Sequence, residues 1–101
     1  MENSQFLRTE MILGKESTNI LASKKVILFG LGGVGSYTAE ALARAGIGKL
    51  TIVDNDTVSV TNINRQLCAL HSTVGKPKVE VVKERILDIN PLCEVTALQK
   101  F

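Results

Sequence analysis

A short apolar segment, Val26 to Phe29, leads directly into the sequence Gly30-Leu-Gly-Gly-Val-Gly35. Four consecutive apolar residues are typical of a strand that is buried on both faces of a parallel sheet. The glycines match the G-x-G-x-x-G pattern, which joins such a strand to a helix in α/β proteins. We therefore expect a strand at 25–29, a tight turn and a helix at 33–45.

The glycines of this turn have separate roles in the pattern. Gly30 permits the tight turn, Gly32 lets the backbone approach a phosphate, and Gly35 allows the helix to pack closely on the strand. The free amides and the positive end of the helix dipole would then face an anion. A glycine-rich turn kept only for packing is the alternative. We expect a nucleotide to be bound by Gly30, Gly32, Gly33 and Gly35.

Strands and helices alternate along the rest of the chain. A second strand is predicted at 50–53, a helix with Pro77 in its first turn runs to Ile89, and a third strand is predicted at 94–98. Such alternation implies parallel pairing through right-handed crossovers. The predicted fold is therefore α/β, a β-α-β-α-β half of a Rossmann-like, doubly wound parallel sheet.

The first residues do not follow this alternation and predict only short helices, broken at Gly14. We divide the chain into an N-terminal helical arm, 1–24, and the N-terminal part of a nucleotide-binding Rossmann-like domain, 25–101. The last strand would be an uncovered sheet edge. We therefore expect the natural gene product to be longer, and expect this chain alone to associate through that edge.

Composition excludes several other classes of protein. The net charge of +2 over 101 residues is too small to indicate a nucleic-acid or membrane surface. No apolar stretch is long enough for a membrane span or a signal peptide, so a cytoplasmic location is expected. Cys68 and Cys93 show no Cys-x-x-Cys spacing, and we expect reduced thiols with no metal site.

Two carboxylates follow the second predicted strand. Asp54 comes 24 residues after Gly30, where an acid accepts hydrogen bonds from ribose hydroxyls. NAD and ATP fit these residues equally well. Asp56 adds a second carboxylate, and paired acids near phosphates can hold magnesium directly or through water. The alternative for Asp56 is an ordinary turn aspartate.

The polar segment that follows favours ATP over NAD. Arg65 offers a bidentate fork for phosphate oxygens, and Asn62 and Gln66 can add neutral hydrogen bonds. Lys78 lies in the first turn of a predicted helix, where its charge opposes the dipole unless an anion is bound. Each cation alone could be a solvated surface charge, but together they suit a triphosphate better than a dinucleotide.

Four motifs in this order and spacing resemble the ThiF/MoeB/HesA family of adenylating enzymes, which are similar to ubiquitin-activating enzyme. The motifs are Gly30–Gly35, Asp54-Asn-Asp56, Asn62–Gln66 and Thr73–Lys78. The resemblance covers nearly the whole chain. It implies an enzyme that uses ATP and Mg²⁺ to adenylate a carboxylate.

The resemblance also implies roles for individual residues. Asp54 would bind the ribose, while Asn62, Arg65 and Lys78 would contact the triphosphate and the charge that develops at the α-phosphate. Arg8 resembles the arginine of the family's N-terminal arm, which reaches the ATP of the partner subunit. A homodimer with an arginine supplied in trans is therefore implied.

Within the family, three segments look most like the branch of tRNA threonylcarbamoyladenosine dehydratases: Asn64, Cys68–Thr73 and Ile89–Pro91. This resemblance implies adenylation of the side-chain carboxylate of a modified tRNA base, followed by an intramolecular attack that displaces AMP and closes a ring. In the alternative branch, the acyl substrate is the C-terminal glycine of a ubiquitin-like sulfur carrier.

Two further classes of function remain open at this point. An NAD-dependent oxidoreductase fits the glycine turn and Asp54 but leaves Lys78 without a role. A non-catalytic module that dimerises through its open sheet edge is also consistent with the sequence. The family's second magnesium-binding aspartate and its substrate loops follow the third strand, so the resemblance implies that full activity belongs to a longer protein.

Overall fold

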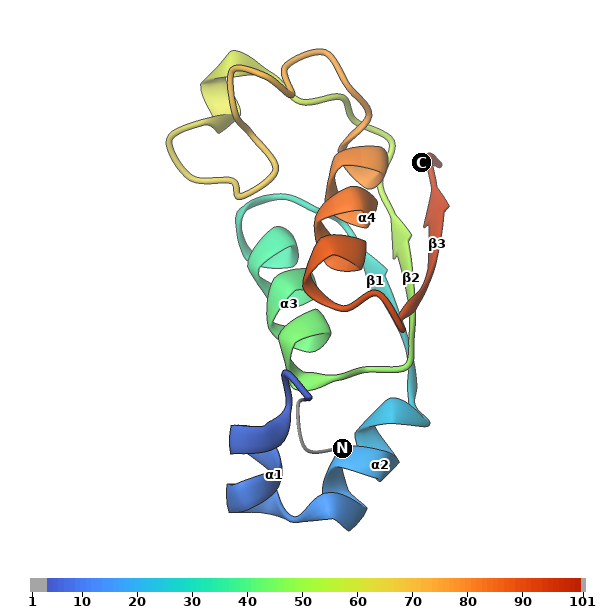
Figure 1. Ribbon diagram of the computed structural model, residues 1–101. Helices are drawn as coiled ribbons and strands as arrows, with labels where there is room; N and C mark the ends of the chain where they lie inside the picture. The colour runs from blue at the N-terminus through green and yellow to red at the C-terminus, as the bar shows by residue number, and fades with distance from the viewer. Residues whose placement is uncertain (1–3, 101) are drawn as a thin grey trace.

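Three parallel strands and two helices form the body of the computed structural model, with a two-helix arm at one end (Figure 1). The structure describes residues 4–100, so positions 1–3 of the predicted arm and position 101 of the predicted domain lie outside the described residues. The elements are α1 Leu7–Leu13, α2 Lys15–Ala22, β1 Lys25–Phe29, α3 Gly33–Ala45, β2 Lys49–Val53, the 3-10 turn η1 Val60–Asn62, α4 Lys78–Ile89 and β3 Glu94–Leu98.

The predicted α/β fold with its parallel sheet is confirmed. The strand order is β1-β2-β3, and both pairings are parallel, with Phe29 opposite Val53 and Val53 opposite Leu98. The start of α4 differs slightly from the prediction. Pro77 precedes the helix in an extended conformation, with ψ 133°, instead of lying in its first turn.

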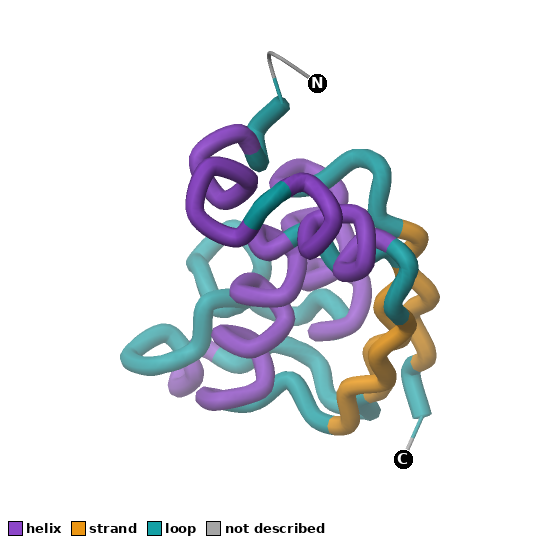
Figure 2. Tube along the Cα trace, turned by 90° about the horizontal axis from the view of Figure 1, so that it is seen from below, coloured by secondary structure: helices purple, strands orange, loops and turns teal. Residues whose placement is uncertain are grey.

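Only one face of the sheet is covered, so the expectation that β1 is buried on both faces is wrong for this chain. Both crossovers run in the same direction along the sheet and, being right-handed, place α3 and α4 on the same side (Figure 2). Ile27 and Phe29 point to the opposite face and are 60% and 76% exposed. Nothing in the described chain packs there.

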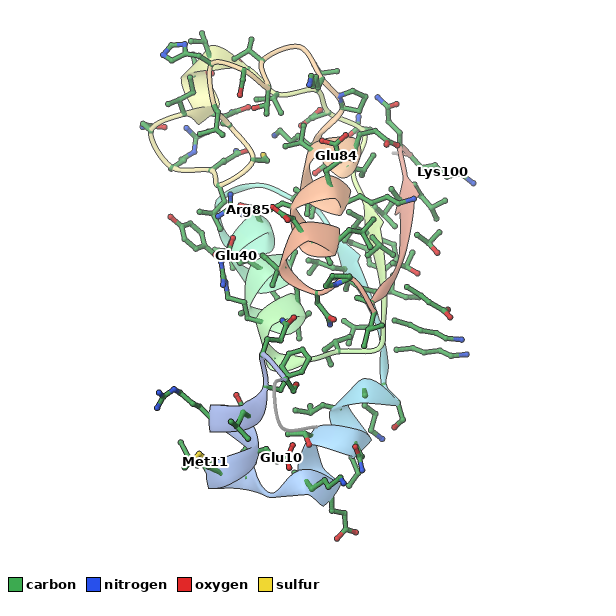
Figure 3. The ribbon with its side chains drawn as sticks, viewed as in Figure 1. Glu10, Met11, Glu40, Glu84, Arg85 and Lys100 are labelled. Atoms are coloured by element: carbon green, nitrogen blue, oxygen red, sulfur yellow. The ribbon has the colours of Figure 1, made fainter. Side chains whose placement is uncertain are left out.

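The hydrophobic core lies between the sheet and its two helices. Ala39 and Ala43 of α3 are fully buried and small, which lets this helix approach the layer beneath it. Glu40 of α3 pairs with Arg85 of α4 and with Arg44 (Figure 3). The core residues are Leu31, Ala39, Ala43, Leu50, Ile52, Val58, Cys68, Ala69, Val79, Val82, Ile86 and Cys93.

The helical arm lies beyond the amino ends of the strands and is only loosely attached to the body (Figure 1). The ring of Phe6 packs over Gly46, and the side-chain amide of Gln5 donates to the carbonyl of Ile89 at 2.7 Å. Neither α1 nor α2 contains a buried residue. The large exposed hydrophobic residues of the arm are Leu7, Met11, Ile12, Leu13 and Ile20.

No helix within residues 4–100 is long and apolar enough to cross a membrane.

Candidate nucleotide-binding site

The glycine turn connects the carboxyl end of β1 to the amino end of α3. Gly30 has φ +90°, a conformation that other residues rarely adopt, and its amide donates to the carbonyl of Val53 at 2.8 Å. A Cβ on Gly35 would lie 2.0 Å from the carbonyl oxygen of Gly30, so only glycine fits there. The close approach sets the first turn of α3 directly beside the end of the sheet.

Nothing within the described chain requires glycine at positions 32 and 33. Both lack the positive φ that favours glycine. A Cβ on Gly33 would meet no atom within 4 Å, and one on Gly32 would meet only the side-chain nitrogen of Gln66, at 3.9 Å. The space in front of these two residues is therefore open at the amino end of a 13-residue helix.

Asp54 connects the glycine turn to the segment that follows β2. One carboxylate oxygen accepts the Leu31 amide at 2.7 Å, and the other accepts the Asp56 amide at 2.8 Å. Each oxygen keeps a further lone pair. Asp54 therefore fixes the turn in position and still has acceptor capacity for a hydroxyl group.

Lys78 is the most informative charged residue near this turn. Its side chain is only 6% exposed, and its ammonium lies 3.8 Å from a carboxylate oxygen of the much more exposed Asp56. Within the described residues, the ammonium makes no hydrogen bond. A side chain buried to this degree leaves its ammonium little contact with water, and one ion pair at 3.8 Å does not fill its donors. It would be stabilised by an anion.

Backbone hydrogen bonds hold Lys78 in this position. Its own amide donates to the carbonyl of Asp56 at 3.0 Å, and the amide of Val58 donates to the carbonyl of Lys76 at 2.8 Å. These bonds tie the start of α4 to the segment after β2. A continuous series of contacts therefore connects Leu31, Asp54, Asp56 and Lys78.

Two buried amide side chains lie in the segment between β2 and α4. The oxygen of Asn62 accepts the Ser59 amide at 2.9 Å, which leaves its amide nitrogen free of a partner among the described residues. Gln66 is 7% exposed and lies beside Gly32. Of the two, Gln66 is thus the one brought next to the glycine turn.

The other two predicted cations lie elsewhere in the structure. The guanidinium of Arg65 is exposed and donates to the carbonyl of Thr61 at 3.1 Å and to the side chain of Asn64 at 2.9 Å. Arg8 is exposed on α1, at the end of the molecule opposite the glycine turn (Figure 1). The structure therefore does not bring Arg8 to the site of its own chain.

Sequence reasoning missed the structural roles of several residues that hold the loop between β2 and α4 in shape. Ser59 and Asn62 form a reciprocal cap around η1, a signal visible in their Ser-x-x-Asn spacing. The hydroxyl of Thr73 donates to the carbonyl of Cys68 at 2.6 Å and accepts the Leu70 amide at 2.9 Å. The hydrogen bonds of Thr73 reach up to five residues along the chain, and no sequence pattern predicts them.

Both cysteines are buried free thiols. Burial raises the pKa of the Cys68 thiol, and the nearby Lys78 ammonium opposes that effect only in part. Burial also raises the pKa of the Cys93 thiol. Neither thiol is therefore activated as a nucleophile. Among residues 4–100, no three histidine, cysteine or acidic side chains gather in a metal-binding group.

Comparison with known proteins identifies close relatives. The ThiF family model matches residues 4–101. The tRNA threonylcarbamoyladenosine dehydratase of Bacillus subtilis is 57% identical over 97 residues, which are 96% of this chain and 38% of that protein. The molybdopterin-synthase adenylyltransferase of Salmonella typhimurium is 43% identical over 80% of this chain and 32% of its own length.

A solved structure shows the same fold. The crystal structure of the Escherichia coli tRNA threonylcarbamoyladenosine dehydratase TcdA, in complex with ATP, is similar with a TM-score of 0.93 at 47% identity. The match covers 96% of this chain and 40% of that one. The chain therefore spans well under half the length of the relatives it matches.

Proposed function

Because the chain belongs to the ThiF family, we propose that it carries part of the ATP-binding site of a tRNA threonylcarbamoyladenosine dehydratase. The 57% identity to the Bacillus subtilis dehydratase supports this branch of the family. The structural observation that carries the proposal is the buried Lys78 ammonium, which has no hydrogen bond within the described residues and lies 3.8 Å from Asp56. A triphosphate would add hydrogen-bond acceptors and further negative charge to the single ion pair with Asp56.

The site offers distinct groups for each part of ATP. The open space before Gly33 and the amino end of α3 suit a phosphate. The remaining lone pairs of Asp54 suit the ribose hydroxyls. Lys78 and Gln66 provide buried donors for phosphate oxygens. Arg65 would have to leave the carbonyl of Thr61 to join them.

In the proposed reaction, a carboxylate oxygen of the modified tRNA base attacks the α-phosphate and pyrophosphate leaves. A neighbouring group of the same base then attacks the activated acyl carbon, AMP leaves and a ring closes. Lys78 would stabilise the negative charge that develops on the α-phosphate oxygens. The glycine turn, held by Asp54, would position the phosphates for in-line attack.

Magnesium is implied by the family and fits the donors present. The carboxylate of Asp56 is 64% exposed, and hard oxygen ligands of this kind suit Mg²⁺. The triphosphate would supply most of the remaining ligands. When bound, the ion would neutralise phosphate charge, and the Asp56 carboxylate would be one of its ligands.

A second acyl substrate is supported by one comparison. The 43% identity to a molybdopterin-synthase adenylyltransferase favours the C-terminal glycine of a ubiquitin-like sulfur carrier as the alternative. The carboxylate would attack the same α-phosphate, so the residues described here would have the same roles. NAD, in contrast, gives the buried Lys78 ammonium less charge to neutralise and is not favoured by these relatives.

We also propose a homodimer that operates in the cytoplasm, where tRNA is modified. The arm supports this proposal, because α1 and α2 bury none of their own residues and expose Met11 and Ile12. An apolar surface of this kind needs a partner. Docking of the arm on a second subunit would allow Arg8 to reach that subunit's nucleotide.

Calorimetric titration with ATP and Mg²⁺ tests the nucleotide site. We expect saturable binding that Lys78→Met weakens by about tenfold or more, since a charge-assisted contact contributes roughly 1.5–3 kcal/mol. Methionine keeps the buried aliphatic stem, so the fold is preserved. Lys24→Ala removes an equal charge at the other end of the molecule and should leave ATP binding unchanged.

Two outcomes would contradict the proposal. Tight binding of NAD without competition from ATP would restore the oxidoreductase. ATP binding that Lys78→Met and Lys24→Ala affect equally would show that Lys78 has no specific contact with the nucleotide.

A further inference from the structure

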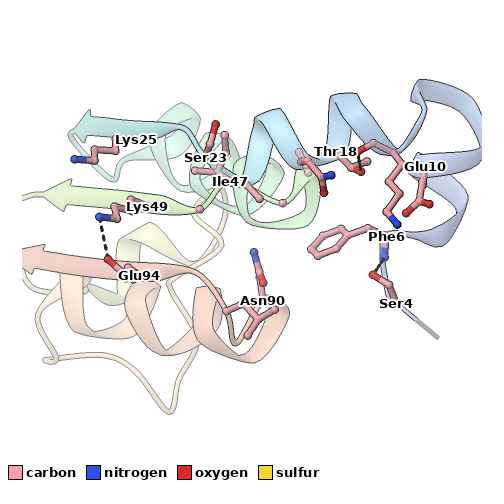
Figure 4. Close-up of a pocket in the computed structure, with 17 residues that line it drawn as sticks. Ser4, Phe6, Glu10, Thr18, Ser23, Lys25, Ile47, Lys49, Asn90 and Glu94 are labelled. Carbon is pink, nitrogen blue, oxygen red and sulfur yellow. Dashed lines mark hydrogen bonds and ion pairs between the residues drawn. The ribbon is translucent and has the colours of Figure 1, made fainter. Parts of the chain in front are cut away.

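A second cavity lies at the opposite end of the sheet from the glycine turn. It has a volume of about 530 Å³, is partly open to solvent, and lies between the arm and the amino ends of the strands (Figure 4). Small-molecule sites typically measure about 300–1,000 Å³. The arm contributes eight residues between Ser4 and Ser23, among them Phe6, Glu10 and Lys15. The body contributes Lys25, the loop from Ala45 to Lys49, and Asn90, Leu92 and Glu94. Nothing in the proposed adenylation reaction uses this cavity.

Asn90 is the buried polar group that points to a ligand here. The residue is 4% exposed and ends α4, where its backbone amide donates to Ile86 and its carbonyl accepts from Cys93. Its side-chain amide has no hydrogen-bond partner among the described residues. Figure 4 shows this side chain reaching into the cavity, toward Ile47 and Phe6. Its donor and acceptor are therefore available to a group inside the cavity.

One aromatic ring and two aliphatic side chains line the cavity near this amide. One edge of the Phe6 ring packs over Gly46, with three ring carbons 3.4–3.6 Å from the position of a Cβ there. The rest of the ring lines the cavity, together with Ile47 and Leu92. Leu92 is 78% exposed, so its side chain has no other cover within residues 4–100. The cavity can therefore hold a planar group against an aromatic ring.

The charged residues of the cavity favour an anion at its rim. Lys49 is paired with Glu94 at 3.5 Å, and Lys25 lies beside them on the open face of the sheet, away from Phe6 and Asn90 (Figure 4). Lys15 lines the cavity and forms no ion pair among the described residues. Glu10 is the remaining acid in the lining and could accept hydroxyl groups. An aromatic wall, an amide and the free Lys15 ammonium together match a base, its sugar and its phosphate.

We propose that this cavity binds a nucleobase with its attached ribose phosphate. The base would lie against Phe6, with its polar edge hydrogen-bonded to Asn90, and the phosphate would meet Lys15. Aromatic side chains stack on bases, and an asparagine amide matches the donor and acceptor on the edge of adenine. The ligand is a free nucleotide or an unstacked base of single-stranded RNA, which share this chemistry. The inference does not depend on the function proposed for the glycine turn.

An NMR titration of the ¹⁵N-labelled chain tests the proposal, because it reports the two sites separately. Amides of Gly46 and Gly48 and the side-chain amide of Asn90 report the cavity, while the Gly30–Gly35 amides report the glycine turn. We expect AMP to shift the cavity signals along a saturation curve of their own. Asn90→Ala should weaken that curve by about tenfold, the loss expected for a buried hydrogen bond. Phe6→Leu should weaken it as well while keeping an apolar contact with Gly46.

Controls decide which part of the ligand is recognised. Asn55→Ala removes an exposed asparagine at the other end of the sheet and should leave the cavity curve unchanged. Ribose 5-phosphate lacks the base and should bind much more weakly than AMP; equal affinity would overturn the proposal. Cavity signals that do not respond to AMP, or that respond equally in Asn90→Ala, would also overturn it.

Two comparisons assign the source of the ligand and separate the two sites. Tighter binding of a short single-stranded oligoadenylate than of AMP would identify an RNA base, and the reverse order would identify a free nucleotide. Shifts of the Gly30–Gly35 amides with ATP test the adenylation site independently. The failure of either proposal can therefore be recognised without the other.

Discussion

Gly33 and Gly35 lie two residues apart in the first turn of α3, yet the chain constrains them differently. Gly35 faces the carbonyl of Gly30 at a distance that excludes any side chain, whereas Gly33 faces open space. A glycine that packing does not require is available for close approach of a ligand. The two positions therefore separate the structural role of the motif from its binding role.

Alanine substitutions at these positions should give opposite results. We expect Gly35→Ala to lower the free energy of unfolding by about 3 kcal/mol, because the new methyl group clashes with backbone. Gly33→Ala should change it by less than about 1 kcal/mol, but should weaken ATP binding. Denaturant unfolding and calorimetry on both variants measure this contrast. Equal loss of stability would show that Gly33 is needed for folding, and the inference about ligand approach would fail.

Asp54 has a structural role that can be measured without any nucleotide. We expect Asp54→Asn to destabilise the chain by about 1–3 kcal/mol, since an amide nitrogen would then face one of the two backbone N–H groups that the carboxylate accepts. Thermal unfolding measures the loss. Asp88→Asn, at an exposed position of α4, should leave the melting temperature unchanged or slightly raised. An unaltered melting temperature for Asp54→Asn would contradict the role in holding the turn.

At the scale of elements, α3 and α4 are joined on their outer surface by charged side chains. Glu40 pairs with Arg85 across the two helices (Figure 3) and with Arg44 on its own helix, and its side chain is 20% exposed. The hydrogen bond from Arg85 is the largest cause that lowers the pKa of the Glu40 carboxyl below its ordinary value of 4.5, and burial opposes it. The pair fixes the spacing of the two helices that position Gly33 and Lys78.

This pairing predicts how stability depends on pH. A carboxyl whose pKa is lowered in the folded state stabilises the fold above its unfolded pKa, and that contribution is lost as the pH falls through the folded value. We expect Glu40→Gln to be less stable than the parent at pH 7 by about 1 kcal/mol or less, because the arginines are partly exposed. The difference should shrink below about pH 4.5.

Unfolding experiments between pH 3 and pH 7 would measure this difference, with Glu84→Gln as the control. Glu84 lies on α4 beside Arg85 and forms no ion pair among the described residues. A difference between the parent and Glu40→Gln that stays constant over this range would contradict the assignment.

At the scale of the whole molecule, two surfaces lack a covering layer. One is the open face of the sheet around Ile27 and Phe29, and the other is the arm with its exposed Met11 and Ile12. The match covers 38% of the length of the Bacillus subtilis relative, and the rest of that relative has no counterpart in this chain. Association through the open edge of β3 remains a prediction beside association through the arm.

Light scattering distinguishes these two modes of association. If the arm mediates dimerisation, Ile12→Lys should convert the dimer to a monomer, because it places a charge in the centre of an apolar contact. Ile12 is 84% exposed, so the monomer should keep its stability. Val60→Lys, a matched change at another exposed apolar position, should leave the dimer intact. A dimer that survives Ile12→Lys would favour the sheet edge, and a parent chain that is monomeric at high concentration would exclude both.

The sequence alone determined the order of elements, the parallel pairing and the glycine turn. These features depend on local patterns, because alternation of apolar runs, chain breaks and the steric freedom of glycine act over a few residues. The same patterns identified the types of residue that could bind a nucleotide. Asp54, Lys78 and Gln66 could thus be proposed as parts of one site before their positions were known.

Only the tertiary structure decided which surfaces and side chains are buried. Val26 and Ile27 are equally apolar in the sequence, yet one faces the helices and the other is open, because the direction of both crossovers decides which face is covered. The burial of Lys78 and the cavity around Asn90 arise from segments far apart in the chain. Such environments depend on long-range packing, and for that reason no local pattern could have predicted them.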